Sequence, residues 1–301
     1  MQVGAVENLK VPTGKKVALK NYDPGWVPKW VVDCEAKKGK KTAKEEVLGI
    51  VEANLQKLVS KQELFWANGT YSMLIILQGM DAAGKDGVIS HVMSGVNPQG
   101  CEVHGFRTPS EEELSHDFLW RYIKVLPEKG RIGIFNRSYY EDVLIVKVRP
   151  EVLEKQKLPH APTGKQFWEE RYQDINRFEQ HLVRNGTVVL KFFLHVSKKK
   201  QKQRFLDRLD DPDKQWKFSL TDLSEREKWN SYMEAYEDVL NETSTECAPW
   251  YIIPADKKWV AHAAISEIIV SQIEGLNLKY PVLSEEQSAA LKNAKAELEK
   301  E

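Results

Sequence analysis

The sequence predicts an α/β fold in which five parallel strands form one sheet with helices on both of its faces. Five short apolar runs alternate with longer stretches in which apolar residues recur at helical spacing, and this alternation is typical of parallel sheets. The first run leads into a glycine-rich loop of the kind that binds phosphate groups. With 301 residues, 42% of them hydrophobic, the chain is long enough to bury one large core.

The order of the elements follows from the pattern along the chain. Residues 1–40 lack a clear period, and we expect them to form an extended arm packed on the body. Helical spacing of apolar residues predicts a helix from Thr42 to about Ala67. The five apolar runs predict strands that are buried on both faces. They cover residues 72–78, 101–106, 131–136, 187–195 and 250–255.

Three helical regions separate the later strands. The first covers residues 110–126 and opens with Ser110 and Glu113 in capping-box spacing. The second covers residues 164–186 and ends at an Asn-Gly pair, which is typical of a helix C-terminus. The third covers residues 198–240 and is broken by a segment that contains a proline.

Composition narrows the classes of partner. Lys plus Arg and Asp plus Glu both total 44, so the formal net charge is zero and no basic excess supports a nucleic acid as partner. The three cysteines, Cys34, Cys101 and Cys247, show no metal-ligand spacing, which favours a reduced, cytoplasmic setting. No run of about 18 apolar residues occurs, so we expect no membrane as partner.

The loop after the first strand has the pattern of a phosphate-binding loop. Gly79, Gly84 and Lys85 satisfy the spacing G-x-x-x-x-G-K, with a strand before the loop and a helical pattern after it. Successive backbone N–H groups and the helix N-terminus would then form an anion cradle. The alternative interpretation is a glycine-rich turn with a surface lysine.

Two aspartates distinguish this loop, because Asp86 follows Lys85 where a hydroxyl residue usually holds Mg²⁺. Carboxylates beside a phosphate cradle repel the phosphate unless a cation lies between them, and Mg²⁺ prefers oxygen ligands. We therefore expect Asp86 to bind Mg²⁺ directly or through water. Asp81 would orient or deprotonate an attacking phosphate oxygen, or serve as a second metal ligand. The alternative is that one of the two only caps the following helix.

Two further clusters carry charge that suits phosphate chemistry. In residues 135–148, which begin where the third strand ends, Arg137 is placed to hold a phosphate bidentately, and two acidic residues follow it. Residues 198–217 carry eight Lys and Arg against four Asp. There Arg204 and Arg208 share a helix face, as in the arginine-bearing lids of phosphate-transferring enzymes. The alternatives are an ordinary surface helix for the first cluster and a solvated lysine face for the second.

Seven motifs, in order from about Lys40 to Pro281, resemble the polyphosphate kinase 2 family. They read GMDAAGKDG, GVNPQG, DFLWR, FNRSYYEDVLIVKV, LKFFLHVSK, RFLDRLDDPDKQWKFS and APWYIIPADKKW. The letters YED after NRSY resemble the subgroup that phosphorylates both nucleoside monophosphates and diphosphates. The subgroup that prefers diphosphates tends to read DRSWYNR at this place.

The resemblance implies a P-loop kinase fold similar to thymidylate kinase. The kinase domain would cover residues 41–283, with a helical lid around 198–222, followed by a charged helical tail at 284–301. The implied reaction is reversible transfer of a terminal phosphoryl group between inorganic polyphosphate and a nucleotide, giving ADP or ATP from AMP or ADP. Mg²⁺, or Mn²⁺ in its place, would be the cofactor, and the chain would form a homo-oligomer, a dimer or a tetramer.

The resemblance also assigns roles to residues of these motifs. Catalytic roles fall on Asp81, Lys85, Asp86, Arg137, Arg204 and Arg208, and the metal would be held by Asp81 and Asp86. Phosphate or polyphosphate binding falls on Gly79, Ala82, Ala83, Gly84, Lys85, Gly87, Lys147, Lys214 and Lys217. Nucleotide binding falls on Phe106, Arg121, Asn136, Glu141 and Asp142. Asn136 departs from the family pattern, because other members have aspartate at this position.

Two other functions share part of this pattern. An ATP-dependent nucleotide kinase would have the same loop and lid but would make little use of polyphosphate. A non-catalytic polyanion-binding protein would use the lysine run, but it would gain nothing from two carboxylates in its phosphate cradle.

Overall fold

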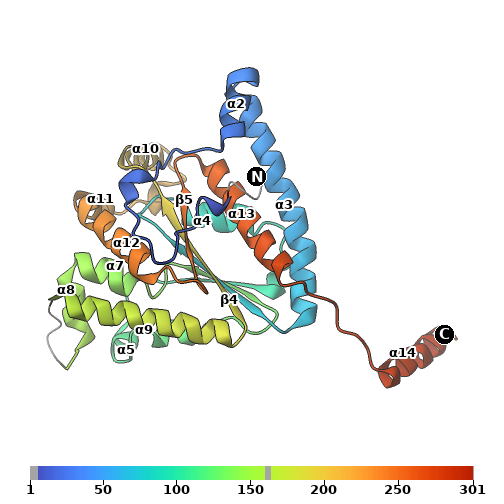
Figure 1. The fold of residues 1–301 in the computed structure, drawn as a ribbon. Coiled ribbons are helices and arrows are strands. Elements are labelled where there is room, and N and C mark those ends of the chain that lie inside the picture. Colours follow the sequence, from blue (N-terminus) through green and yellow to red (C-terminus); the bar gives the residue numbers. More distant parts are fainter. Residues whose placement is uncertain (1–5, 160–163, 301) are drawn as a thin grey trace.

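The computed structural model describes residues 6–159 and 164–300 and contains one parallel sheet of five strands in the order β2-β3-β1-β4-β5 (Figure 1). The predicted strands are confirmed to within one residue at each end. Their bounds are β1 Ser72–Gln78, β2 Cys101–Gly105, β3 Ile132–Asn136, β4 Thr187–His195 and β5 Trp250–Pro254.

The register of the sheet brings the ends of three strands to one edge. Leu77 of β1 pairs with Asn136 of β3, and Gln78 pairs with Phe193 of β4. The segments that follow β1 and β3 therefore start side by side, as ligand-binding segments do in α/β sheets. The expectation that all five strands are buried on both faces is wrong for β2. It is an edge strand, and Val103 is 49% exposed.

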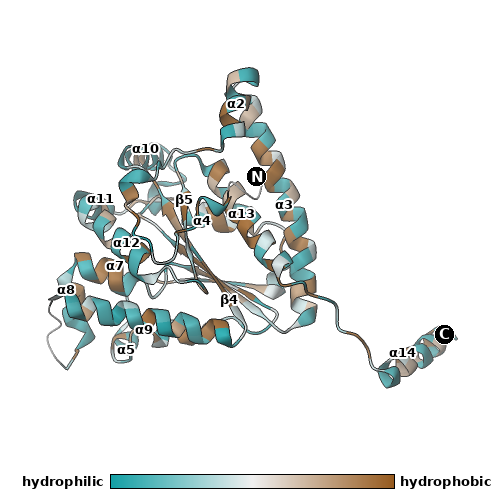
Figure 2. Ribbon diagram, viewed as in Figure 1, coloured by the Kyte–Doolittle hydropathy of each residue, from teal (hydrophilic) through white to brown (hydrophobic). Residues whose placement is uncertain are grey.

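Helices cover both faces of the sheet (Figure 1). One layer contains α3 Lys40–Asn68, α4 Lys85–Val92 and α13 Lys258–Gly275. The other contains α7 Glu141–Val148, α9 Gly164–Arg184 and α12 Trp229–Thr243. Figure 2 shows strand β4 as strongly hydrophobic between them. The apolar runs are thus buried by helices on both sides, which confirms the predicted fold class.

The helical stretch expected at residues 110–126 is two short helices, α5 Glu111–Leu114 and α6 Trp120–Ile123. The capping box of Ser110 and Glu113 is present. The helix nevertheless ends early, because the polar side chains that follow bond to the local backbone. Ser115 Oγ donates to the Glu112 carbonyl oxygen at 2.7 Å, and such bonds compete with helical ones.

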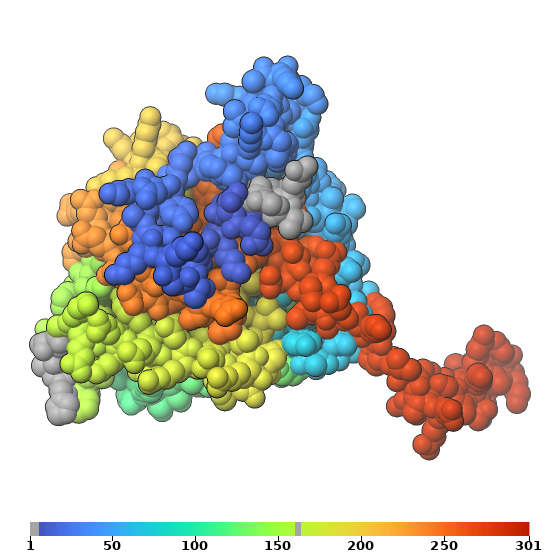
Figure 3. Space-filling view, viewed as in Figure 1, coloured from blue at the N-terminus to red at the C-terminus, as the bar shows by residue number. Residues whose placement is uncertain are grey.

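The N-terminal arm is not extended throughout, contrary to the expectation. It contains a 3₁₀ helix, Leu19–Asn21, and helix α2, Lys29–Lys38, which packs on α3. After a helical turn at residues 6–9, the arm pairs with the edge strand β5: Lys10 forms a bridge with Tyr251, and the Val11 N–H donates to the Trp250 carbonyl oxygen at 2.8 Å. The arm lies across this side of the body (Figure 3) and covers a strand edge that would otherwise be open. Residues 1–5 of the expected arm lie outside the described residues.

The region expected to form the lid contains α10 Lys198–Leu209, a 3₁₀ helix Gln215–Lys217 and α11 Leu220–Glu227. The tail forms helix α14, Glu285–Leu298, which stands away from the body and buries none of its residues (Figure 1). The last residue of the expected tail, 301, lies outside the described residues. Within the described parts of the chain, no helix combines the length and apolar character that a membrane crossing requires.

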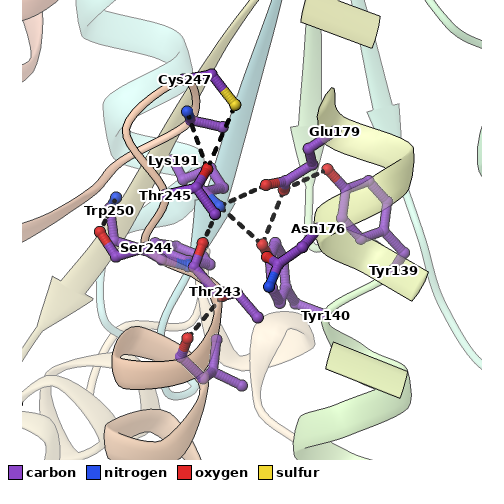
Figure 4. A network of polar contacts seen from close by, with 12 residues as sticks. Tyr139, Tyr140, Asn176, Glu179, Lys191, Thr243, Ser244, Thr245, Cys247 and Trp250 are labelled. Atoms are coloured by element: carbon purple, nitrogen blue, oxygen red, sulfur yellow. Dashed lines mark hydrogen bonds and ion pairs between the residues drawn. The ribbon is translucent and has the colours of Figure 1, made fainter. Parts of the chain in front are cut away.

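The helical layer of α7, α9 and α12 encloses a buried ion pair (Figure 4). Lys191 Nζ lies 2.6 Å from Glu179 Oε2, and both side chains are completely buried. The ammonium also donates to the Tyr140 hydroxyl at 2.9 Å and to the Thr243 carbonyl oxygen at 2.7 Å. The hydroxyls of Tyr139 and Tyr140 both donate to Glu179 Oε1 at 2.8 Å. The network ties the segment after β3 to the scaffold.

Candidate active site

The loop between β1 and α4 has the backbone shape of an anion cradle. Gly79 has φ 153°, and a Cβ at this position would lie 2.9 Å from the Leu194 carbonyl oxygen, so only glycine fits. Gly84 has φ 116° and Ala82 has φ 59°, in the left-handed region that side chains rarely adopt. Helix α4 begins at Lys85 directly after this turn. The predicted phosphate-binding loop is therefore formed in the structure, and the interpretation as an ordinary turn is disfavoured.

Lys85 is folded onto the loop itself. Its Nζ donates to the Gly79 carbonyl oxygen at 2.6 Å and to the Met80 carbonyl oxygen at 3.4 Å. Burial, with a contribution from the Arg137 guanidinium, lowers the pKa of Lys85. A phosphate oxygen is a stronger partner for this ammonium than a carbonyl group, so the lysine is placed to exchange one for the other.

The two loop aspartates are each bonded to a side chain from the end of β3. Arg137 Nη2 donates to Asp81 Oδ1 at 3.0 Å, and Asn136 Nδ2 donates to Asp86 Oδ1 at 2.7 Å. Arg137 has φ 68°, and its N–H donates to the Leu77 carbonyl oxygen, so the segment after β3 turns sharply toward the loop. Gly84 occupies the N-cap position of α4, and Asp86 lies in the first turn of this helix, where a negative charge also favours the helix N-terminus.

The donor atoms at this place fit a hard divalent cation. Each aspartate uses one carboxylate oxygen in the bonds above and keeps a second oxygen for another partner. Across residues 6–159 and 164–300, no three His, Cys, Asp or Glu side chains form a metal cage. Mg²⁺ needs no such cage, because it is usually bound by one or two carboxylates together with substrate phosphates and water.

The two carboxylates at the start of α7 differ in their surroundings. Burial raises the pKa of Glu141, while Arg137 and Lys85 lower it, so this side chain faces the cations of the loop. Asp142 is buried, and Gln156 Nε2 donates to its Oδ1 at 2.7 Å. Burial raises the pKa of Asp142 to about 6. Asp142 therefore holds the wall of the site in place more than it offers oxygens to a ligand.

A cavity of about 350 Å³ adjoins the loop. This volume is within the usual range of small-ligand sites. Seven of the residues expected from the sequence line it, and they are Gly79, Asp81, Phe106, Arg121, Arg137, Glu141 and Asp142. The structure thus brings the loop, the end of β3 and the start of α7 to one hollow.

One wall of the cavity offers an aromatic and cationic surface. The Arg121 guanidinium lies 5.2 Å from the centre of the Phe106 ring, and Phe106 packs edge to face on Phe135. Arg121 Nη2 also donates to the Arg107 carbonyl oxygen at 2.9 Å, which fixes its plane. Such a surface suits a planar base or a nucleotide phosphate.

The opposite wall comes from α11 and α12, and the expected site did not include its residues. Ser219, Asp222, Glu225 and Tyr236 line the cavity there. Burial and the nearby Asp81 carboxylate raise the pKa of Asp222. One signal for this wall was present in the sequence, because Ser219 and Asp222 have capping-box spacing and form that cap.

Arg204, expected on a lid, is bonded to the body of the protein in this structure. It is 7% exposed, and its guanidinium donates to carbonyl oxygens of the phosphate-binding loop and of the segment after β5. In this structure α10 packs on the phosphate-binding loop through Arg204, and the lid around residues 198–222 stays a prediction. Arg208, one turn later, donates to the Lys217 carbonyl oxygen at 3.5 Å and lies 5.8 Å from the centre of the Phe205 ring; among the described residues it has no ion pair, so its charge remains available.

The three lysines expected to bind phosphate have other partners. Lys147 Nζ lies 2.5 Å from Asp238 Oδ2 and also contacts Tyr172, so its charge is neutralised between α7 and α12. Lys214 pairs with Asp211 on the surface. Lys217 lies over the Trp216 ring at 5.0 Å. Phosphate binding by Lys147 would need it to leave Asp238, whereas the exposed pair of Lys214 is weak enough to exchange partners.

Several cations lie near Lys258, the first residue of α13. Burial lowers the pKa of Lys258, and Arg204, Arg208 and Lys214 lower it further, so these four charges repel one another. Burial, with smaller contributions from neighbouring cations, also lowers the pKa of His262 to about 4. A bound anion would relieve the repulsion among these cations. The cluster adjoins the phosphate-binding loop, because Arg204 donates to the Ala82 carbonyl oxygen.

Comparison with known proteins agrees with this chemistry. The chain is 52% identical over 240 residues to the ADP-polyphosphate phosphotransferase of Rhodopseudomonas palustris, covering 79% of this chain and 83% of the relative. It is 45% identical over 276 residues to the AMP/ADP-polyphosphate phosphotransferase of Meiothermus ruber, covering 92% and 96%.

A solved structure is similar over nearly the whole chain. The crystal structure of Polyphosphate Kinase 2 from Arthrobacter aurescens TC1 superimposes with a TM-score of 0.83 at 37% identity, covering 97% of this chain and 96% of the other. The sequence model named Polyphosphate kinase 2 (PPK2) matches residues 36–281. The chain therefore belongs to the polyphosphate kinase 2 family.

Proposed function

We propose that the protein transfers the terminal phosphoryl group of inorganic polyphosphate to AMP and ADP, reversibly and with a divalent cation. One observation carries the proposal. A phosphate-binding loop with two carboxylates adjoins a cavity of nucleotide size and, through Arg204, a cluster of cations. The names of the relatives from R. palustris and M. ruber support ADP and AMP as acceptors.

The residues of the cavity would bind and orient the nucleotide. Phe106 and Arg121 offer a surface for the base, and Arg137 would release Asp81 to hold the acceptor phosphate. The cation cluster would hold the polyphosphate chain, with Arg208 and Lys258 as its open charges. Catalysis would then consist mainly of positioning and charge neutralisation, as in other phosphoryl transfers.

Lys85 would leave the loop carbonyls and follow the transferred phosphoryl group. The phosphorus–oxygen bond to the acceptor phosphate forms as the bond to the next phosphate of the chain breaks. Mg²⁺ or Mn²⁺, held by Asp81 and Asp86 together with phosphate oxygens, would supply charge neutralisation. The partly buried Glu141 would bias the site toward monophosphates, in line with the YED motif.

A donor comparison tests the proposal. The protein is incubated with Mg²⁺ and AMP, with either polyphosphate or ATP as phosphoryl donor, and the nucleotides are separated by chromatography. Formation of ADP and ATP from polyphosphate, absent with EDTA, is expected. Turnover with ATP as donor and none with polyphosphate would show an ATP-dependent nucleotide kinase instead.

The family resemblance also predicts a dimer or a tetramer. Light scattering of the purified chain measures this directly, and a monomer at assay concentrations would contradict it.

A further inference from the structure

One face of α10 is bonded to three consecutive carbonyl groups of the phosphate-binding loop. Gln201 Nε2 donates to the Asp81 carbonyl oxygen at 2.9 Å. Arg204 Nη1 donates to the carbonyl oxygens of Ala82 and Ala83 at 2.8 and 2.7 Å. The C=O and N–H groups of a trans peptide point in opposite directions, so the N–H groups of Ala82 and Gly84 face away from α10, whereas the Ala83 N–H donates to the Met80 carbonyl oxygen at 3.0 Å. Helix α10 therefore sets the direction of the loop's anion-binding donors.

Gln201 also bonds to the next helix, α11. Its side chain is buried at 1% exposure, and its Oε1 accepts a hydrogen bond from Arg226 Nη1 at 2.8 Å. Arg226 Nη1 donates further to the Lys198 carbonyl oxygen at 2.8 Å. A guanidinium only donates and a carbonyl group only accepts, so the amide has one orientation that satisfies both neighbours. Glutamate and leucine cannot make both bonds.

Helix α11 is at the same time a wall of the acceptor cavity. Asp222 lies one turn before Arg226 and Glu225 lies directly before it, and both line the cavity together with Asp81. A short path therefore runs from the cavity wall through Arg226 and Gln201 to the backbone of the phosphate-binding loop.

We propose that Gln201 is a positioning residue that ties α11, and with it the wall of the acceptor cavity, to the phosphate-binding loop. It touches no substrate. It holds the carbonyl of Asp81 so that the N–H of Ala82, in the same peptide, stays aimed at the phosphoryl group when α11 contacts the nucleotide. The inference rests on the proposed phosphoryl transfer and adds a residue to it.

Matched variants of α10 and α11 test this role. Gln201→Leu removes both bonds, and Arg226→Leu removes only the bond from α11. Gln203→Leu is the control, because Gln203 lies on the same helix, is exposed and bonds only to Asp207 at 2.9 Å. The measurements are kcat and KM for polyphosphate and AMP, the thermal midpoint, and calorimetric binding of polyphosphate.

We expect Gln201→Leu to lower kcat about 10- to 100-fold, with KM for AMP changed less than about threefold, since a misplaced loop affects the transition state most. Arg226→Leu should also lower kcat, and Arg226→Lys should keep part of the kcat that Arg226→Leu loses. The double variant should be no slower than the slower single variant, because both changes break one path. Gln203→Leu should match the wild type.

Two results would overturn the inference: a Gln201→Leu variant within about twofold of Gln203→Leu in kcat, or losses that multiply in the double variant. If Gln201→Leu does not fold, Arg226→Leu tests the inference by itself. Arg226 is only half-buried, so its replacement is expected to leave the protein folded. A lower kcat at an unchanged thermal midpoint then supports the path, and an unchanged kcat refutes it. A wild type inactive with polyphosphate would instead refute the proposed function.

Discussion

Replacing Glu179 by glutamine tests how strongly the buried ion pair holds the helical layer behind the site. In the wild type, Lys191 Nζ donates to Glu179, to the Tyr140 hydroxyl and to the Thr243 carbonyl oxygen, and both charged side chains are fully buried (Figure 4). Glu179→Gln keeps the size of the side chain but leaves the ammonium without a counter-charge. An unpaired buried charge costs about 3–5 kcal/mol, which is a large share of the stability of an ordinary domain.

Urea denaturation followed by circular dichroism measures this cost. We expect Glu179→Gln and Lys191→Met each to lower the free energy of unfolding by about 3–5 kcal/mol, and the double variant to lose less than either. The control is Glu169→Gln, whose partner Lys165 is 91% exposed, and its loss should stay below about 1 kcal/mol. Single variants that cost as little as this control, or losses that add in the double variant, would refute the reasoning.

The pH dependence of Glu179→Gln gives a second measure. Burial lowers the pKa of Lys191 from its usual value of 10.5, and Glu179 opposes this shift. Without Glu179 the folded protein releases the proton at lower pH than the unfolded chain does. The unfolded state then binds more protons just below pH 10.5, so the stability of the variant should rise as pH rises toward 10.5. A flat profile there would mean that water reaches the ammonium.

Four further predictions concern the site. Lys85→Ala should lower kcat about 10²–10³-fold at an unchanged thermal midpoint, and near-normal turnover would remove Lys85 from the transition state. Arg208→Lys should lower kcat but keep the salt dependence of polyphosphate binding, whereas Arg208→Ala should weaken both; equal losses in the two variants would contradict a bidentate role. Glu141→Gln should reduce turnover of AMP more than that of ADP, and an equal reduction would point to a role shared by both acceptors. In the wild type, the free energy of unfolding should fall as pH falls from 6.5 to about 4, by about 3 kcal/mol at most, because the folded protein resists protonation of the His262 ring. His262→Asn should make this fall shallower. An unchanged slope in unfolding experiments would place the acid sensitivity elsewhere.

The sequence by itself determined the strands, the phosphate-binding loop and the family. These features depend on short-range patterns: an apolar run such as residues 72–78 is typical of a strand buried on both faces, and Gly79, Gly84 and Lys85 have the spacing of a phosphate-binding loop. The register of parallel strands then brings Arg137 to Asp81, as the strand-end positions predicted. The same strand register helps to place seven expected residues around one cavity.

Only the tertiary structure decided which partner each charged side chain has. Arg204 and Arg208 look alike in the sequence, but Arg204 lies under the loop and is bonded to its carbonyl groups, whereas Arg208 lies one turn farther out. Lys147 was expected at a phosphate and instead pairs with Asp238, 91 residues away. The start of α11 had a local signal in its capping-box spacing, but neither its place in the cavity wall nor the path through Gln201 was visible in the sequence. Hydrogen bonds and ion pairs join segments that are distant along the chain, and local periodicity carries no information about which distant donor and acceptor will meet.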